Sequence, residues 1–152
     1  MPNTKPIGVA YSDPDLSGGT LDNTPIGAVT PSTVEGTTVY ADVEIGYAAV
    51  AQGAVTQLTS KSTAVTLNTS AGQITMNAAS LAATTNVTFT LTNSTISAKD
   101  VLLLTVTNGT SASYNAFVSS MSAGAATITL RNISASPLAE AVVINFAIIH
   151  CA

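Results

Sequence analysis

Charged side chains are scarce in this sequence of 152 residues. They make up 8% of the chain, against about 25% in an average globular protein. Only four are basic, and the formal net charge is −4. A nucleic-acid-binding surface needs clustered lysine and arginine side chains, whereas these four are scattered at Lys5, Lys61, Lys99 and Arg131. The composition therefore argues against nucleic acid as a partner and predicts that hydroxyl and amide groups keep the protein in solution.

Cysteine, tryptophan and long apolar runs are also lacking. The single Cys151 excludes an internal disulfide, and a chain of this length can fold as one domain without disulfides or metal. No apolar run approaches the roughly 20 residues of a membrane-spanning helix, and the first residues lack the apolar segment of a secretion signal. We therefore expect synthesis in the cytoplasm and no membrane partner. The absence of tryptophan argues against a sugar-binding face built from stacked aromatic rings.

Proline is distributed unevenly, since five of the six prolines precede residue 37. Proline removes a backbone donor and fixes φ, so a segment rich in it does not join a sheet interior. Residues 1–36 are predicted to form an extended attachment arm. Residues 37–152 are predicted to form the body, and its best-supported part is 53–152.

Two similar apolar segments lie in the arm, Pro6–Ala10 and Pro25–Val29. They suggest two docking points, and an aromatic side chain in such a segment can anchor in a partner's pocket. Chance similarity in a low-complexity stretch and a partly exposed tyrosine are the alternative interpretations. The residues predicted to bind a partner are Ile7, Val9, Tyr11, Ile26 and Val29.

The remainder is rich in residues that favour strands, with 24 threonines and 16 serines in the whole chain. Alternating side chains predict a half-buried strand at 37–47. The one helical piece expected is a connector at Asn77–Ala83. Eight further strands are predicted at Val55–Leu58, Ala64–Leu67, Gln73–Met76, Val87–Thr92, Val101–Thr107, Tyr114–Ser119, Ala126–Arg131 and Val142–Ile149.

Three of these runs carry more information than the others. The last run is apolar on both alternating sets, which predicts a central strand covered on both faces. Val101–Val106 is also apolar on both sets and is interpreted as a buried centre, whereas Val87–Thr92 has one apolar and one threonine face. Asn108-Gly109 signals a turn and predicts a hairpin between the strands that flank it. The fold class expected is an all-β antiparallel sandwich, jelly-roll or immunoglobulin-like, with an extended N-terminal arm.

No constellation of catalytic residues stands out. The body offers two acids after residue 53, Asp100 and Glu140, both expected to be solvated loop residues, whereas glycoside hydrolysis needs a carboxylate pair across a cleft. His150 and Cys151 are neighbours, and adjacent strand residues point to opposite faces, so a frayed strand end is expected there. Three copies of His150 on a three-fold axis could bind a metal ion. No cofactor, metal or catalytic residue is predicted, and Tyr114 and Phe117 are expected in the core.

Several stretches between Gly53 and Ile149 resemble a β-module found in structural proteins of tailed-bacteriophage virions. The resemblance covers roughly two-thirds of the chain and does not include residues 1–52. The stretches that carry it are Gly53–Gln57, Ser60–Asn68, Gly72–Asn77 and Glu140–Ile148.

The resemblance implies a non-enzymatic virion protein of the capsid decoration or head-fibre type. We expect a homotrimer on the outer surface of the capsid, made in the host cytoplasm, with the major capsid protein as partner. The arm would bind the shell and stabilise it. The alternative is a tail-fibre or receptor-binding subunit whose body contacts host surface polysaccharide; a depolymerase is a third interpretation, for which the paired acids are missing.

Overall fold

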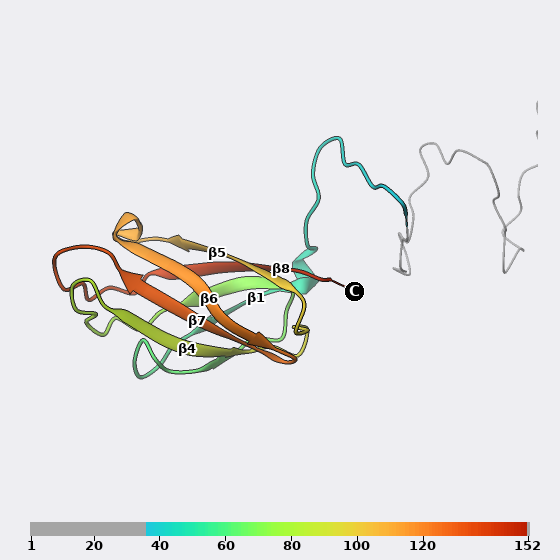
Figure 1. Cartoon of the computed structure of the whole chain (residues 1–152). Coiled ribbons are helices and arrows are strands. Elements are labelled where there is room, and N and C mark those ends of the chain that lie inside the picture. The colour runs from blue at the N-terminus through green and yellow to red at the C-terminus, as the bar shows by residue number, and fades with distance from the viewer. Residues whose placement is uncertain (1–35, 152) are drawn as a thin grey trace, which may run out of the picture. The chain divides into compact units, whose positions relative to one another are not determined.

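The computed structural model describes residues 36–151 (Figure 1). The chain divides into two units, and the boundary lies between Asp42 and Val43. In the first unit, residues 36–42 are exposed and have no regular structure. The strand predicted at 37–47 is wrong, because no described segment pairs with these residues despite their alternating pattern. All the strands found within residues 36–151 belong to the second unit, and the fold described below is that of this body.

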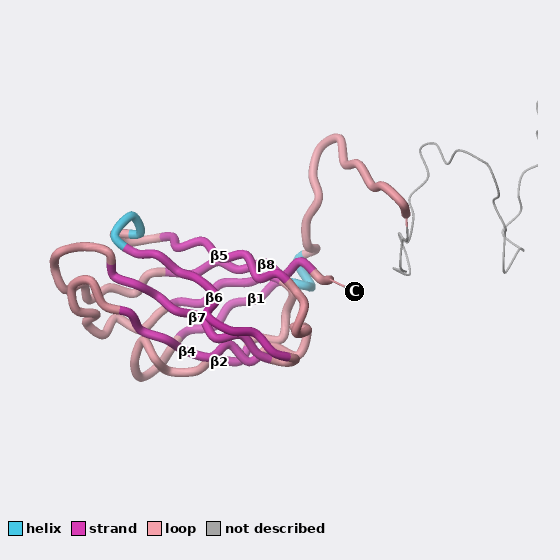
Figure 2. Tube along the Cα trace, viewed as in Figure 1, coloured by secondary structure: helices cyan, strands magenta, loops and turns pink. Residues whose placement is uncertain are grey.

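Eight strands form the body, in two four-stranded sheets (Figure 2). Sheet A has the order β1-β3-β8-β5, and sheet B has the order β2-β4-β7-β6. The short 3-10 helices η1 and η2 span Ala49–Ala51 and Ser111–Ser113. The strands are β1 (Gln52–Thr56), β2 (Val65–Thr66), β3 (Ala71–Thr75), β4 (Asn86–Thr92), β5 (Val101–Thr107), β6 (Tyr114–Ser122), β7 (Ala125–Asn132) and β8 (Val143–Ile149).

Both sheets are mixed. β1 pairs with β3 in parallel, as does β2 with β4, while the four other pairings are antiparallel. The all-β class is confirmed, and each of the eight predicted strands overlaps an observed one, although the strand predicted at Val55–Leu58 shares only two residues with β1. The purely antiparallel arrangement is wrong. The chain passes from β1 in sheet A to β2 in sheet B and back to β3, so neighbours in sequence are separated and parallel partners result.

The core lies between the two sheets, which pack against each other (Figure 1). The alternating pattern of β4 confirms its predicted half-buried character, since Phe89 and Leu91 are buried while Thr88 and Thr92 are exposed. Opposite it, Ile74 of β3 and Ile144 of β8 are fully buried. Each such side chain contributes about 1.5–3 kcal/mol through removal of apolar surface from water.

The two apolar runs of sheet A occupy different positions. β8 is an interior strand, as predicted, with Ile144, Phe146 and Ile148 buried, but its other face is only partly covered. β5 is an edge strand rather than a buried centre, and its outward side chains Val101 and Leu103 are 45% and 52% exposed. Local apolarity therefore did not distinguish a covered strand from an edge.

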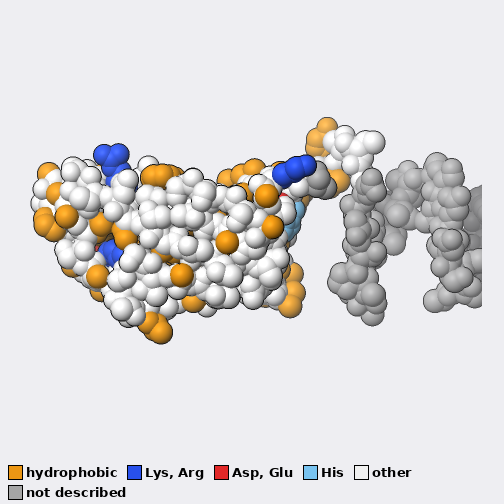
Figure 3. Space-filling model, turned by 60° about the horizontal axis from the view of Figure 1, so that its bottom comes forward, with side chains coloured by type: hydrophobic (Ala, Val, Ile, Leu, Met, Phe, Trp, Pro, Cys, Tyr) orange, Lys and Arg blue, Asp and Glu red, His pale blue; other side chains and the backbone are white. Residues whose placement is uncertain are grey.

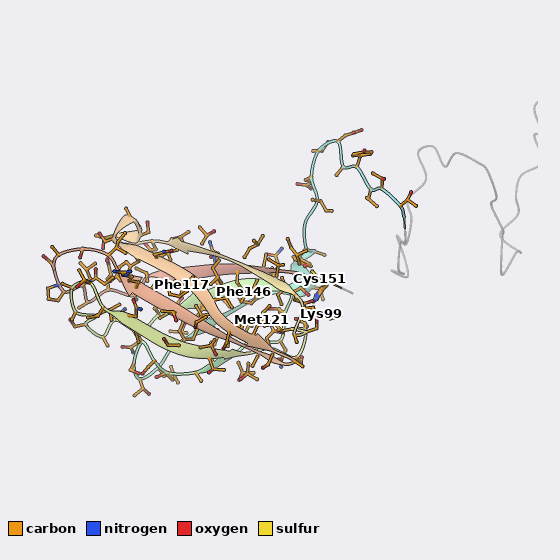
Figure 4. All side chains as sticks on the ribbon, viewed as in Figure 1. Lys99, Phe117, Met121, Phe146 and Cys151 are labelled. Atoms are coloured by element: carbon orange, nitrogen blue, oxygen red, sulfur yellow. The ribbon has the colours of Figure 1, made fainter. Side chains whose placement is uncertain are left out.

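Three smaller predictions are corrected by the fold. The turn at Asn108-Gly109 exists, with positive φ at both residues, but β5 and β6 belong to different sheets and do not form a hairpin. The helix predicted at Asn77–Ala83 is absent, because Leu81 forms a β-bridge with Leu138. Tyr114 is buried as predicted, whereas Phe117 is 41% exposed on the edge strand β6 (Figure 4).

Candidate functional site

The strand directions give the body two distinct ends. The proximal end carries Tyr47, Asp100 and His150, where β8 ends and β1 and β5 begin. The distal end carries Lys61 and Glu140, where β5 ends and β8 begins. We describe these ends separately because their polar contacts differ.

A buried carboxylate organises the proximal end. Asp100 Oδ2 lies 2.9 Å from Nδ1 of His150, and Oδ1 accepts the main-chain N–H of Cys151 at 3.0 Å. Ser97 donates from both its backbone N–H and its hydroxyl group. The side chain of Asp100 is 1% exposed and that of His150 is 48% exposed. The expected frayed end after β8 and the expected solvated Asp100 are both wrong, because this carboxylate fixes residues 150 and 151 to the β4–β5 loop.

These contacts perturb the titration of Asp100. Hydrogen bonds from Ser97 contribute most, and those from Cys151 and His150 act in the same direction, so the pKa of Asp100 is held well below its usual range. Cys151 and Lys99 mark this end of the body in Figure 4. The arrangement is suited to holding chain segments together.

The segment before β1 is joined to the last strand. The Tyr47 hydroxyl group donates to the main-chain carbonyl of Ile148, and Gln52 Nε2 donates to the carbonyl of Tyr47 at 2.7 Å. Between this segment and sheet A lies an apolar hollow of about 510 Å³, which Leu103 and Ile149 help to line. This hollow continues onto the exposed outer side of β5. The outer face of sheet A is therefore apolar at its proximal end.

Lysine holds the distal loops together. Lys61 is 3% exposed, and its Nζ donates to the main-chain carbonyls of Asn77 at 2.5 Å and Glu140 at 2.6 Å. Burial lowers the pKa of Lys61, while the charge of Glu140 opposes that shift. Gln57 is also buried, and it donates to the carbonyls of Lys61 and Thr63. A single ammonium group thus connects three segments that are distant in sequence.

Asn132 connects a further set of distal loops. It is fully buried, and its Nδ2 donates to the carbonyls of Leu81, Ala82 and Ser136 at 2.8–3.1 Å. Its Oδ1 accepts from the backbone and hydroxyl groups of Ser134. Because every polar atom of this amide has a partner, the side chain replaces regular strand pairing in the loops that follow β3 and β7.

The two acids considered from the sequence are not brought together. Asp100 precedes β5, whereas Glu140 accepts hydrogen bonds from Thr110, which follows β5. A seven-residue strand separates these positions, a length of roughly 23 Å at 3.3 Å per residue. Carboxyl pairs in glycosidases are about 5–9.5 Å apart. These two residues therefore serve as hydrogen-bond acceptors at opposite ends.

A second surface feature is polar. Gln52, Gln73 and Asn145 line an open hollow of about 620 Å³ on the outer side of sheet A, with Ala54 and Ala71 between them. The Oδ1 atom of Asn145 is buried and has no hydrogen-bond partner in the described structure. Amide groups of this kind both donate and accept, which suits hydroxyl-rich ligands. On the face drawn in Figure 3, most of the surface is backbone or uncharged side chains, and few charged side chains appear.

Other chemical features were also sought in residues 36–151. Within that range no three histidine, cysteine or acidic side chains gather into a group able to hold a metal ion. No helix in the same range has the length and apolarity needed to cross a membrane. The residues predicted to bind a partner all lie outside the described part of the chain: Ile7, Val9, Tyr11, Ile26 and Val29.

The comparisons with known proteins give no relative for this chain. No protein-family model matches it, and no significant match is found among curated proteins or solved structures.

Proposed function

We propose that this chain is a structural protein of a bacteriophage virion, a decoration protein that binds the outer surface of the capsid through residues 1–36. The major capsid protein is the proposed partner, and the body is a sandwich of jelly-roll or immunoglobulin-like kind. The resemblance in residues 53–149 supplies the class. The structural observation that supports the proposal is that each of the two ends of the body is held together by its own set of hydrogen bonds.

The proximal end supports an attachment role for the segment before β1. Tyr47 and Gln52 fix the start of the body to its last strand, so a load applied through the N-terminal residues passes directly into sheet A. At the distal end, Lys61 and Asn132 connect the loops to one another. A protein attached through its N-terminal segment would present these tied loops to the surroundings.

The composition also suits a protein that is present in many neighbouring copies on one shell. Few charged residues limit electrostatic repulsion between neighbouring copies, and hydroxyl groups maintain hydration. Binding of many copies, each with modest affinity, would resist expansion of a shell through avidity. The chain would therefore stabilise the capsid without any chemical reaction.

The direct test is to locate the protein on purified particles. A tagged copy should label the whole head surface, and removal of residues 1–36 should abolish the label. A finer variant replaces by serine the four aliphatic residues predicted to bind the capsid: Ile7, Val9, Ile26 and Val29. A matched control replaces four polar residues of the same segment by alanine and should keep the label: Thr4, Ser12, Thr24 and Thr30. Label confined to tails, or head label that survives the deletion, would contradict the proposal.

The polar hollow favours one second candidate, a tail-fibre subunit that contacts host polysaccharide. Gln52, Gln73 and Asn145 offer amide donors and acceptors to sugar hydroxyl groups. Binding of purified host polysaccharide should then weaken when exposed Gln73 is changed to alanine. It should be unaffected by Asn115→Ala, a change at an exposed amide on sheet B. Equal binding by both variants would show that the hollow is not the glycan-binding site.

A further inference from the structure

The outer edge of β5 lacks the features that normally protect a sheet edge. Each sheet has two edge strands, β1 and β5 in sheet A and β2 and β6 in sheet B. Natural edges are kept from pairing by shortness, bulges, charged side chains or proline. The four edges of this body can be compared on these criteria.

Three of the edges carry such protection. β2 has only two residues, and β6 has an irregularity between Val118 and Ser120. β1 is five residues long, contains Gly53, and directs only Gln52, Ala54 and Thr56 to its exposed side. Glycine weakens a strand, and small or polar side chains provide little apolar surface for a partner.

β5 has none of these protective features. It is seven residues long, pairs in regular register with β8, and has no charged residue, proline or glycine. No backbone hydrogen bond joins its other side to a segment within residues 36–151. Its outward residues Val101 and Leu103 are 45% and 52% exposed, and Ile149 beside Val101 on β8 is 52% exposed. A long, regular, apolar edge is a template for another strand.

The charge distribution is compatible with a second copy of the same strand as the partner. A two-fold contact brings the same patch of both copies together, so a patch of one sign would repel itself. β5 and β8 carry no charged side chain. The adjoining hollow is lined by apolar residues such as Ile45 and Leu103 together with His150, whose imidazole pairs with the carboxylate of Asp100. This neutral apolar surface is complementary to itself. Mixed or one-sided charge, which would have favoured a different partner protein, is lacking on both strands.

We propose that β5 of one copy pairs antiparallel with β5 of a second copy, which joins the two A sheets into one continuous eight-stranded sheet. In the proposed register, the exposed Leu103 lies opposite Leu103 of the partner copy, and Leu102 lies opposite Leu104. This two-fold contact differs from the three-fold assembly expected from the virion class, and the number of copies in the complex distinguishes the two. It requires only the body, and it holds wherever the protein is located.

Analytical ultracentrifugation of the full chain tests the pairing. The wild type is expected to sediment as a two-copy complex. Leu103→Lys places two like charges opposite each other and should raise the dissociation constant at least about tenfold. Phe117→Lys is the matched control, because Phe117 is an exposed apolar residue on the bulged edge β6 and should leave association unchanged. In samples dilute enough to contain only single copies, both variants should keep the wild-type urea midpoint, since both side chains are already exposed.

A disulfide tests the register. In the Cys151→Ser background, Leu103→Cys should form an intermolecular disulfide under mild oxidation, because directly opposed strand residues have Cα atoms about 4.5–5.5 Å apart. Phe117→Cys should not. A monomer, a trimer, or a two-copy complex that Leu103→Lys leaves intact would overturn the pairing. A two-copy complex lost in Leu103→Lys but without the Leu103→Cys disulfide would overturn the proposed register.

Discussion

The carboxylate of Asp100 and the imidazole of His150 meet at 2.9 Å although the two residues are 50 positions apart. Asp100 lies just before the edge strand β5, and His150 follows the interior strand β8. The same carboxylate also accepts from Cys151 and Ser97. One buried acid therefore closes the proximal end of sheet A.

Asp100 is predicted to make the protein sensitive to acid. Its pKa is strongly lowered in the fold, so the charged form contributes stability above the ordinary aspartate value near about pH 4. That contribution is lost as the pH falls from there toward the pKa of the folded state. Asp100→Asn should reduce stability at neutral pH and flatten the loss on acidification.

Urea unfolding at neutral pH and at about pH 3 measures this effect. Glu140→Gln is the comparison variant, because the pKa of Glu140 is also lowered, by hydrogen bonds from Thr110, but its side chain is less enclosed. It should flatten the acid response less than Asp100→Asn. An Asp100→Asn protein that keeps the full wild-type acid dependence would show that another group controls it.

Lys61 is predicted to stabilise the distal loops through its two carbonyl contacts. Lys61→Met keeps an unbranched side chain, one heavy atom shorter, but leaves the carbonyls of Asn77 and Glu140 without their donor. The expected loss is about 1–3 kcal/mol of unfolding free energy, measured by urea denaturation. Lys99→Met, at an exposed position, should change it by less than about 0.5 kcal/mol. Equal effects of the two changes would contradict the structural role of Lys61.

Asn132 is predicted to be more sensitive to charge than to truncation. Asn132→Ala removes the donors to three carbonyls and should cost about 2 kcal/mol or more. Asn132→Asp keeps the shape but turns a carboxylate toward those same carbonyls, so its loss should be larger. Thermal unfolding of both, with exposed Asn86→Ala as a neutral control, tests this order. The reverse order would indicate that the amide donors are unimportant.

Gly72 is predicted to be required for the packing of sheet A. A Cβ atom there would lie 2.7 Å from the carbonyl oxygen of Gly53 and 2.9 Å from Cδ2 of Leu67. The backbone contact cannot yield by a side-chain rotation, so Gly72→Ala should cost about 1–3 kcal/mol. Gly46→Ala adds a Cβ with no atom within 4 Å and should be nearly neutral. Denaturant midpoints measure both, and a harmless Gly72→Ala would require a backbone shift between β1 and β3.

The strand content could be predicted from sequence because alternation and β-branched residues are local signals. The position of β5 could not, since Val101 and Leu103 are as apolar as residues of the core although they lie at an edge. The parallel pairs could not be predicted either, because the pattern of a strand does not identify its partner. The false strand at 37–47 has the same origin: its alternation is present, but a pairing partner is not.

The polar contacts at the two ends of the body could not be predicted from local sequence signals either. Asp100 looks like an ordinary turn residue beside Lys99, and only the return of β8 brings His150 and Cys151 to it. Lys61 likewise has no acidic neighbour in sequence, and its acceptors are main-chain carbonyls whose positions depend on the fold. Burial of a single charged residue in a charge-poor chain leaves no spacing pattern to recognise.

The interior position of β8 has a consequence for the order in which the protein is made and folded. All four strands of sheet B precede β8, so that sheet can assemble on the emerging chain. In sheet A, β8 lies between β3 and β5. Until the ribosome has completed β8, β1 and β3 can therefore pair only with each other, and β5 has no partner in the sheet. During that interval the apolar inner face of sheet B has no opposing layer, which is the condition under which nascent β proteins aggregate or need a chaperone. Closure of the body is therefore a late event, set by its last strand.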